Sequence, residues 1–158
     1  LYKVLVSITD ELQNRKQVLR TAGVANIDEY NRNAEKKLYR IVFACDEIAE
    51  VLDKTGLSKQ QKDEILKIES ELSIIARQGR AFGIHLVLAT QRPDAAILNG
   101  QIRNNIDTRI CGRADNVLSQ IILDNTDASD KIAKSSQGRF LTNSGKIFQA
   151  YWFDENIL

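Results

Sequence analysis

The sequence contains no methionine, one proline, one histidine and two cysteines among its 158 residues. Cys45 and Cys111 do not form a CxxC pair, so we expect two buried, reduced thiols rather than a disulfide framework or a zinc site. The single histidine, His85, lies in an apolar run, which favours a packed neutral side chain over a catalytic one. No apolar run approaches the ~20 residues that a membrane-spanning helix needs, and no signal peptide is visible. The composition is therefore that of an ordinary globular domain.

Opposite charges are nearly balanced, with 22 Lys and Arg residues against 21 Asp and Glu residues and a formal net charge of +1. The chain has no overall basic character, so any contact with nucleic acid must come from a local group of basic residues. A hydrophobic fraction of 43% suits a compact core, and we predict a single domain over residues 1–158. The chain begins at Leu1, inside a helical pattern, and we expect it to be part of a longer protein.

Apolar periodicity predicts alternating helices and strands. The expected helices cover about residues 5–22, 27–30, 59–79, 96–103 and 116–123, and the expected strands cover residues 40–45, 84–89, 108–111, 139–142 and 146–153. Residues 40–45 and 84–89 are continuous apolar runs, which are typical of strands buried on both faces of a parallel sheet. We expect Pro93 to end the second of these strands. The order of elements indicates an α/β fold with a mainly parallel sheet.

Polar residues follow the two strongest strands. Asp46 and Glu47 come directly after the first strand, and Thr90 and Gln91 come directly after the second. In an open parallel sheet, ligands bind at the carboxyl ends of the strands. We therefore expect these four side chains to share one edge of the sheet.

An apolar strand followed by Asp-Glu is the Walker B pattern of nucleotide hydrolases. Asp46 would then hold Mg²⁺, usually through water, and Glu47 would activate the attacking water. The local pattern is equally consistent with two acidic residues at the start of the next helix, where the helix dipole stabilises negative charge. The polar pair Thr90-Gln91 at the neighbouring strand end favours the first reading, although a polar strand-to-loop transition is its simpler alternative.

Five arginines could stabilise negative charge on a transferred phosphoryl group: Arg77, Arg80, Arg92, Arg109 and Arg113. An arginine in such a role reaches the γ-phosphate from the neighbouring subunit. Each is more often a surface or structural residue, and Arg80 is our first candidate because it leads into the second strand.

A phosphate-binding loop of the form G-x-x-x-x-G-K-[ST] is absent. Gly145 is the one glycine followed by a lysine, and Lys146 is followed by Ile147, which fits a hairpin turn. Without that loop, we expect the chain alone to bind ATP weakly.

The stretch IARQGRAFGIHLVLATQRPDAAILNGQIRNNIDTRICGRADNVLSQIILDN (residues 75–125) closely resembles the FtsK/SpoIIIE family of motor domains. IVFACDEIAEVL (residues 41–52) resembles that family's Walker B segment, and AGVANIDEYN (residues 22–31) resembles the segment before it. The resemblance implies a RecA-like P-loop three-layer sandwich, with the Walker A loop upstream of this chain. It further implies Asp46 as the magnesium residue, Glu47 as the water-activating residue and Gln91 as the γ-phosphate sensor, with Thr90 beside the nucleotide.

Residues 124–155 look closest to the coupling proteins of Gram-positive conjugative elements. This likeness implies a homo-hexameric, membrane-anchored ATPase whose cytoplasmic domain uses ATP and Mg²⁺ to pass DNA through a ring pore, together with other transfer-machinery proteins. Residues 99–105, with Arg103, are the candidate DNA contact, against the simpler reading of a solvated loop. Two alternatives stay open: a type VII secretion ATPase module that moves protein, and an assembly module that does not hydrolyse ATP.

Overall fold

The computed structural model describes residues 1–91 and 100–151 of the chain, and Pro93 therefore lies outside the described residues. The chain divides into two compact units, the first comprising residues 1–91 and 100–106 and the second residues 107–151 of the described part. The assignment of residues 1–158 to a single domain stays a prediction. No helix among the described residues has both the length and the apolar character to cross a membrane.

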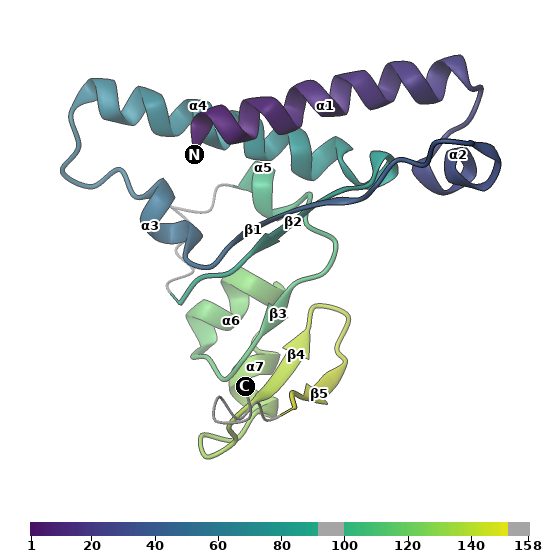
Figure 1. Ribbon diagram of the computed structural model, residues 1–158. Helices are drawn as coiled ribbons and strands as arrows, with labels where there is room; N and C mark the ends of the chain where they lie inside the picture. The colour runs from purple at the N-terminus through teal and green to yellow at the C-terminus, as the bar shows by residue number, and fades with distance from the viewer. Residues whose placement is uncertain (92–99, 152–158) are drawn as a thin grey trace, which may run out of the picture. The chain divides into compact units, whose positions relative to one another are not determined.

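Two twenty-residue helices form the outer layer of the first unit. Helix α1 (Tyr2–Thr21) packs along α4 (Lys59–Gln78). Both helices lie over the same face of the strands at residues 41–45 and 84–88 (Figure 1). Ser58 and Gln61 form a capping box that starts α4, because each side chain accepts a backbone N–H of the other residue. The two long predicted helices are thus confirmed, and α4 ends at Gln78, one residue before the end predicted for it.

Shorter elements connect these helices to the strands. They are α2 (Ile27–Asn33), α3 (Ile48–Leu52), the 3₁₀ turn η1 (Arg80–Phe82) and α5 (Gly100–Arg103). Asn26 caps α2, because its side chain accepts the backbone N–H of Glu29. Of the helix predicted over residues 96–103, residues 96–99 lie outside the described part.

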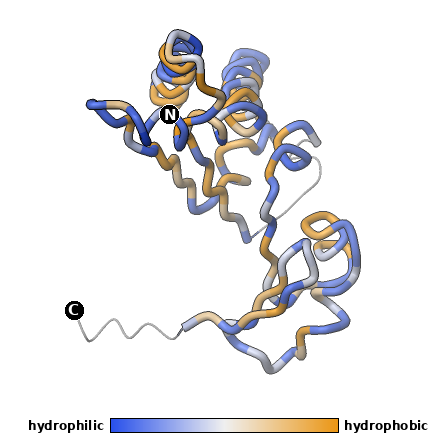
Figure 2. Tube along the Cα trace, turned by 90° about the vertical axis from the view of Figure 1, so that its right-hand side faces the viewer, coloured by the Kyte–Doolittle hydropathy of each residue, from blue (hydrophilic) through white to orange (hydrophobic). Residues whose placement is uncertain are grey.

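The two strands with polar ends pair in parallel. Strand β1 (Ile41–Cys45) aligns with β2 (Ile84–Leu88) so that Ile41 faces Ile84 and Cys45 faces Leu88. One face of the strand pair packs onto a core that α1, α3, α4 and α5 share. The strand residues in contact with this core include Phe43, Cys45, Leu86 and Leu88. Figure 2, in which α1 and α4 are seen nearly end-on, shows hydrophobic residues on these helices above the strands.

The opposite face of the strand pair is exposed in this chain. Val42 is 61% exposed and Val87 is 55% exposed. The prediction that both strands are buried on both faces is therefore wrong for the described residues, because helices cover only one side of the pair. An apolar strand indicates that both of its faces favour burial. It does not show that residues of this same chain pack against each face.

The second unit contains a separate antiparallel sheet. Strands β3 (Ile110–Cys111), β4 (Arg139–Thr142) and β5 (Ile147–Gln149) are arranged in that order, with helices α6 (Asn116–Leu123) and α7 (Asp127–Lys131) between β3 and β4. The predicted hairpin is confirmed, with Gly145 in its turn at φ 84°. The third predicted strand does not join the parallel sheet, since its two residues pair with β4.

Neither cysteine forms a disulfide. Cys111 is buried in the second unit, and burial raises the pKa of its thiol. Cys45 is only half-buried, so the prediction of two buried thiols is correct for Cys111 and wrong for Cys45. His85 is half-buried on β2.

Candidate active site

The backbone ladder of the parallel strands continues into the polar segments that follow them. The N–H of Ala89 donates to the carbonyl of Cys45 at 2.8 Å, and the N–H of Ile48 donates to the carbonyl of Ala89 at 2.9 Å. These bonds keep the chain after β1 beside the chain after β2. The carboxyl ends of both strands therefore meet at one edge, as the sequence pattern predicted.

Glu47 lies at the centre of this edge. The Thr90 hydroxyl donates to its Oε1 at 2.5 Å, and the Gln91 N–H donates to its Oε2 at 2.9 Å. Glu47 also accepts the N–H of Ala49 at 3.3 Å and so caps the first turn of α3. The structure thus brings three of the four predicted residues into direct contact through one carboxylate.

Asp46 lies directly between β1 and Glu47, and its side chain is exposed. It accepts no hydrogen bond from the described residues, so its oxygens are open to a hydrated cation. Among those residues there is also no group of three or more His, Cys, Asp or Glu side chains that could hold a metal. A single exposed carboxylate is a ligand that Mg²⁺ can use, since this ion keeps several waters and combines one or two carboxylates with the phosphates of a substrate.

Gln91 contributes its backbone to the contact with Glu47, and its side chain is exposed. An exposed amide at the end of β2 has both an N–H donor and a carbonyl acceptor for a water or a phosphate oxygen. The sensor role of Gln91 stays a prediction.

Arg80 is not part of this edge. It begins η1, which precedes β2, whereas Thr90 and Gln91 follow β2. A strand of five residues spans roughly 16 Å at about 3.3 Å per residue, so the two positions lie at opposite ends of the strand. Arg80 is exposed. Its position is therefore compatible with action on another subunit's site rather than on the site of its own chain.

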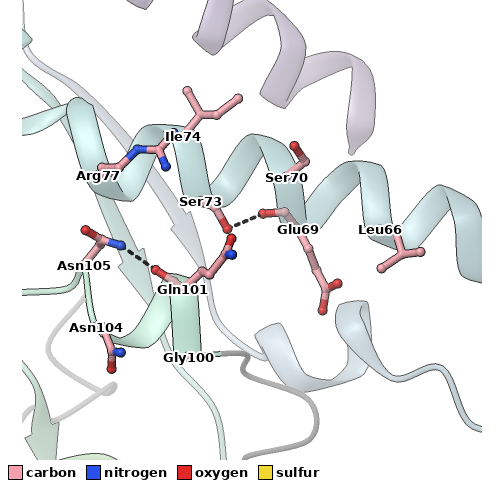
Figure 3. Close-up of a pocket in the computed structure, with 10 residues that line it drawn as sticks. All are labelled: Leu66, Glu69, Ser70, Ser73, Ile74, Arg77, Gly100, Gln101, Asn104 and Asn105. Atoms are coloured by element: carbon pink, nitrogen blue, oxygen red, sulfur yellow. Dashed lines mark hydrogen bonds between the residues drawn. The ribbon is translucent and has the colours of Figure 1, made fainter.

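Helix α5, which carries Arg103, packs against α4 through the fully buried Ile102. A groove runs between the two helices, and Figure 3 shows Arg77 and Gln101 among its lining residues. Arg103 is half-buried, and its Nε has no hydrogen-bond partner among the described residues. Asn99, at the start of the predicted DNA-contacting segment, lies outside the described residues.

The remaining arginine candidates separate into surface and structural residues. Arg77 is exposed on α4, and Arg92 lies outside the described residues. In the second unit, Arg109 pairs with Asp124 at 2.5 Å, and Arg113 donates to the carbonyl of Ile132 at 2.7 Å. The first contact lies at the C-terminal end of α6, and the second binds a backbone carbonyl. Both arginines therefore have structural roles.

Sequence relatives are DNA translocases. The chain is 33% identical over 145 residues to the DNA translocase FtsK of Chlorobaculum tepidum, and 34% identical over 136 residues to that of Chlamydia pneumoniae. These matches cover 90% and 82% of this chain but only 16% and 17% of the relatives. The chain thus spans about one sixth of the length of these relatives. No protein-family model matches the sequence.

Solved structures identify the fold. The conjugation coupling protein TcpA of pCW3, solved as a monomer form with ATPγS, superposes with a TM-score of 0.90 and 40% identity over 99% of this chain and 45% of its own. Two type VII secretion ATPases share the fold at lower identity: EssC of Geobacillus thermodenitrificans (TM-score 0.68, 23%) and EccC of Thermomonospora curvata (0.70, 22%). EssC is matched over 92% of this chain and 25% of its own, and EccC over 96% and 18%. The predicted α/β, RecA-like P-loop fold class is confirmed.

Proposed function

Because the chain belongs to the FtsK/SpoIIIE family of motor domains, we propose that it is part of an ATP-driven DNA translocase that acts as a conjugation coupling protein. The coupling-protein assignment is supported by the 40% identity and TM-score of 0.90 to TcpA, against 22–23% identity to the secretion ATPases. The observation that carries the catalytic part is the contact of Glu47 with Thr90 and Gln91 at one edge of the parallel strands.

Hydrolysis in this proposal uses the two acidic residues after β1. Asp46 would hold Mg²⁺ through water, and the bound ion would supply positive charge that stabilises the phosphates of ATP. Glu47 accepts a proton from the attacking water as its oxygen bonds to the γ-phosphorus. The bond from that phosphorus to the β–γ bridging oxygen breaks, and ADP leaves with that oxygen.

The other site residues respond to the terminal phosphate. Gln91 senses the γ-phosphate through its exposed amide, and Thr90 fixes the end of β2 beside the nucleotide. Arg80, at the opposite end of β2, stabilises the transition-state charge in the site of a neighbouring subunit. That assignment requires a ring, which we propose to be a homo-hexamer.

DNA passes through the pore of this ring and contacts α5, where Arg103 supplies positive charge for a phosphate. The parent protein is anchored in the bacterial membrane, and this chain belongs to its cytoplasmic part, where it works with other transfer-machinery proteins. We further propose that residues 1–158 alone do not hydrolyse ATP, because the sequence contains no G-x-x-x-x-G-K-[ST] loop.

The substitution Glu47→Gln in the full-length protein tests the catalytic assignment. It keeps the size of the side chain but removes the base, so the rate of ATP hydrolysis should fall by roughly 100-fold or more. ATP binding should persist, as measured with a fluorescent ATP analogue. Unchanged hydrolysis would remove Glu47 from its assigned role.

Stimulation by DNA separates the proposed function from its alternatives. A DNA translocase should hydrolyse ATP faster when double- or single-stranded DNA is added, whereas a type VII secretion ATPase should respond to its protein cargo. A non-hydrolysing assembly module should show no hydrolysis under either condition. The shared fold of EssC and EccC does not decide between these alternatives, since it concerns architecture alone.

A further inference from the structure

The carboxylate of Glu47 is occupied by donors from the protein itself. Its Oε1 accepts both the Thr90 hydroxyl and the N–H of Ala49, and its Oε2 accepts the N–H of Gln91. A carboxylate oxygen has two lone pairs in its plane, so Oε1 has none left for a water. The three bonds use both lone pairs of Oε1 and one of Oε2, so the carboxylate is directed mainly at the protein rather than at an attacking water.

Helix capping explains only one of these three contacts. The bond from Ala49 to Glu47 satisfies an N–H of the first turn of α3. Glutamate is not among the preferred capping residues, and a cap needs no partner on another strand. The bonds from Thr90 and Gln91 instead join segments that lie 43 and 44 positions apart in the sequence. They tie the proposed base to the end of β2.

We propose that Thr90 is a positioning residue that restrains Glu47 in a resting state, and that activation of hydrolysis requires its release; this inference rests on the proposed function of Glu47. The hydroxyl of Thr90 is the side-chain component of the restraint, and the N–H of Gln91 is its backbone component. The backbone bonds of Ala89 hold β1 and β2 together, so the movement begins after Ala89. When Thr90 and Gln91 move away from Glu47, both bonds break together, and the carboxylate becomes free to face the nucleotide.

The position of the restraint offers a route from DNA to the catalytic base. Gly100, the first residue of α5, follows Gln91 by nine positions, and Arg103 lies at the end of that helix. The restraint at Thr90 and Gln91 is therefore close in the sequence to the helix that the proposed function assigns to DNA. A restraint located there keeps hydrolysis slow without DNA and permits it when DNA is bound.

The test compares ATP hydrolysis by the full-length protein and its Thr90→Val variant, with and without DNA. Valine has nearly the shape of threonine but no hydroxyl, so the DNA-free rate should rise severalfold and the stimulation ratio should fall. Thr90→Ser restores the donor and should bring the DNA-free rate back down. The matched control is Thr55→Val at an exposed loop position, which should leave both rates unchanged.

A double variant shows whether the raised rate uses the proposed base. Thr90→Val combined with Glu47→Gln should be as inactive as Glu47→Gln alone. The inference is overturned if Thr90→Val lowers both rates, because Thr90 would then orient Glu47 for catalysis, or if it changes neither. Misfolding is excluded by an unchanged melting temperature and retained ATP-analogue binding. If Glu47→Gln itself leaves hydrolysis intact, the proposed function fails instead.

Discussion

The two units of this chain build their sheets in opposite ways. In the first unit, Ile41 pairs in parallel with Ile84, and the intervening chain contains α3 and α4. In the second unit, β4 and β5 form a hairpin in which Leu141 pairs with Ile147 across a short turn. The first sheet therefore depends on contacts between distant segments, and much of the second depends on local ones.

This difference determines where a site can form. Parallel strands need a long crossover, so both strands end at the same edge and no turn occupies that edge. Glu47 and Thr90 meet there for this reason. In an antiparallel hairpin, the end of one strand lies beside the start of the next, and the turn residues fill the space. Within residues 107–151, the second unit thus offers no equivalent edge, and its polar side chains mainly stabilise turns.

The largest expected effect tests whether the two units are stabilised separately, and it comes from a cavity made in the core of one unit at a time. Leu72 on α4 is fully buried in the first unit, and Leu141 on β4 is fully buried in the second. Each Leu→Ala substitution should lower the free energy of unfolding of its own unit by about 2–5 kcal/mol. Hydrogen exchange should show faster exchange in β1 and β2 for Leu72→Ala, and in β4 and β5 for Leu141→Ala.

The two substitutions serve as controls for each other. If either one loosens the strands of both units to the same extent, the units unfold as one cooperative body. The comparison between two separately stabilised sheets would then be wrong.

Much of the first unit could be predicted because its signals are long and periodic. The strands at residues 41–45 and 84–88 fall within one residue of the predicted bounds, and α6 has the predicted bounds. Placing Glu47 near Thr90 required only that two neighbouring strands run parallel. The hydrogen bond between their side chains could not be predicted, because it depends on rotamers and on the exact register of the strands.

The errors concern short elements and missing neighbours. Helices α3 and α7 have five residues each, which is too short for an apolar period to appear. Strand β3 has two residues, and tertiary contacts with β4 decide its pairing. The exposure of Val42 and Val87 does not follow from the strand runs, because an apolar run shows which residues favour burial and not which other residues of this chain cover them.

A second, smaller effect concerns a buried charge that ties α1 to the start of β2. Arg15 is 4% exposed; its Nε donates to Glu11 at 2.7 Å, and its Nη1 donates to the carbonyl of Phe82 at 2.8 Å. Arg15→Ala should lower the free energy of unfolding by about 2–3 kcal/mol, because the carbonyl loses its partner. Urea unfolding measures this loss, and Arg20→Ala, at an exposed position of the same helix, is the control.

The same pair predicts a dependence on pH. The hydrogen bond from Arg15 lowers the pKa of Glu11 below its model-compound value of 4.5. The folded state therefore binds a proton at Glu11 less readily than the unfolded state, so this contribution is present above about pH 4.5 and is lost as the pH falls through the folded pKa. Arg15→Ala should reduce this contribution, and the hydrogen bond from Asn14 to Glu11 should keep the rest. A stability profile between pH 3 and 6 that keeps its slope in the variant would contradict the assignment.

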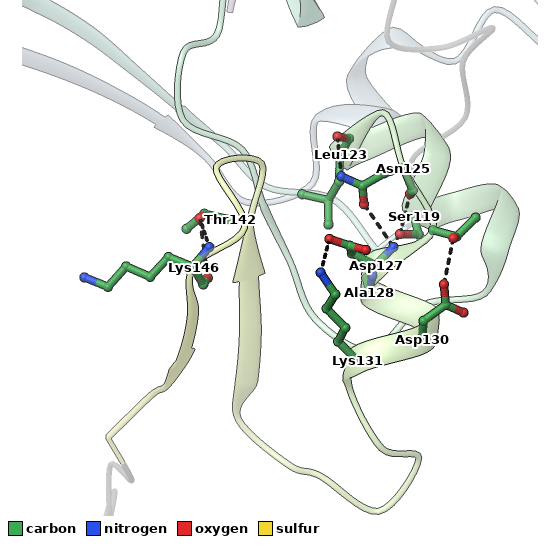
Figure 4. Close-up of polar contacts among 10 residues, drawn as sticks. Ser119, Leu123, Asn125, Asp127, Ala128, Asp130, Lys131, Thr142 and Lys146 are labelled. Carbon is green, nitrogen blue, oxygen red and sulfur yellow. Dashed lines mark hydrogen bonds and ion pairs between the residues drawn. The ribbon is translucent and has the colours of Figure 1, made fainter.

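The smallest of the three effects concerns the polar contacts of the second unit. Ser119 is fully buried; its hydroxyl donates to the carbonyl of Asn125 at 2.7 Å and accepts the N–H of Ala128 at 3.1 Å (Figure 4). Ser119→Ala leaves both backbone groups without this partner, so the second unit should lose about 1–2 kcal/mol. Hydrogen exchange should detect the loss at Ala128 and α7, while β1 and β2 of the first unit keep their protection.

Ser135→Ala, at an exposed loop position, should change neither. Equal protection of Ala128 in the variant and the unaltered chain would show that the hydroxyl does not hold this turn, and the contrast between a unit stabilised by turns and a unit with a polar edge would lose its clearest support.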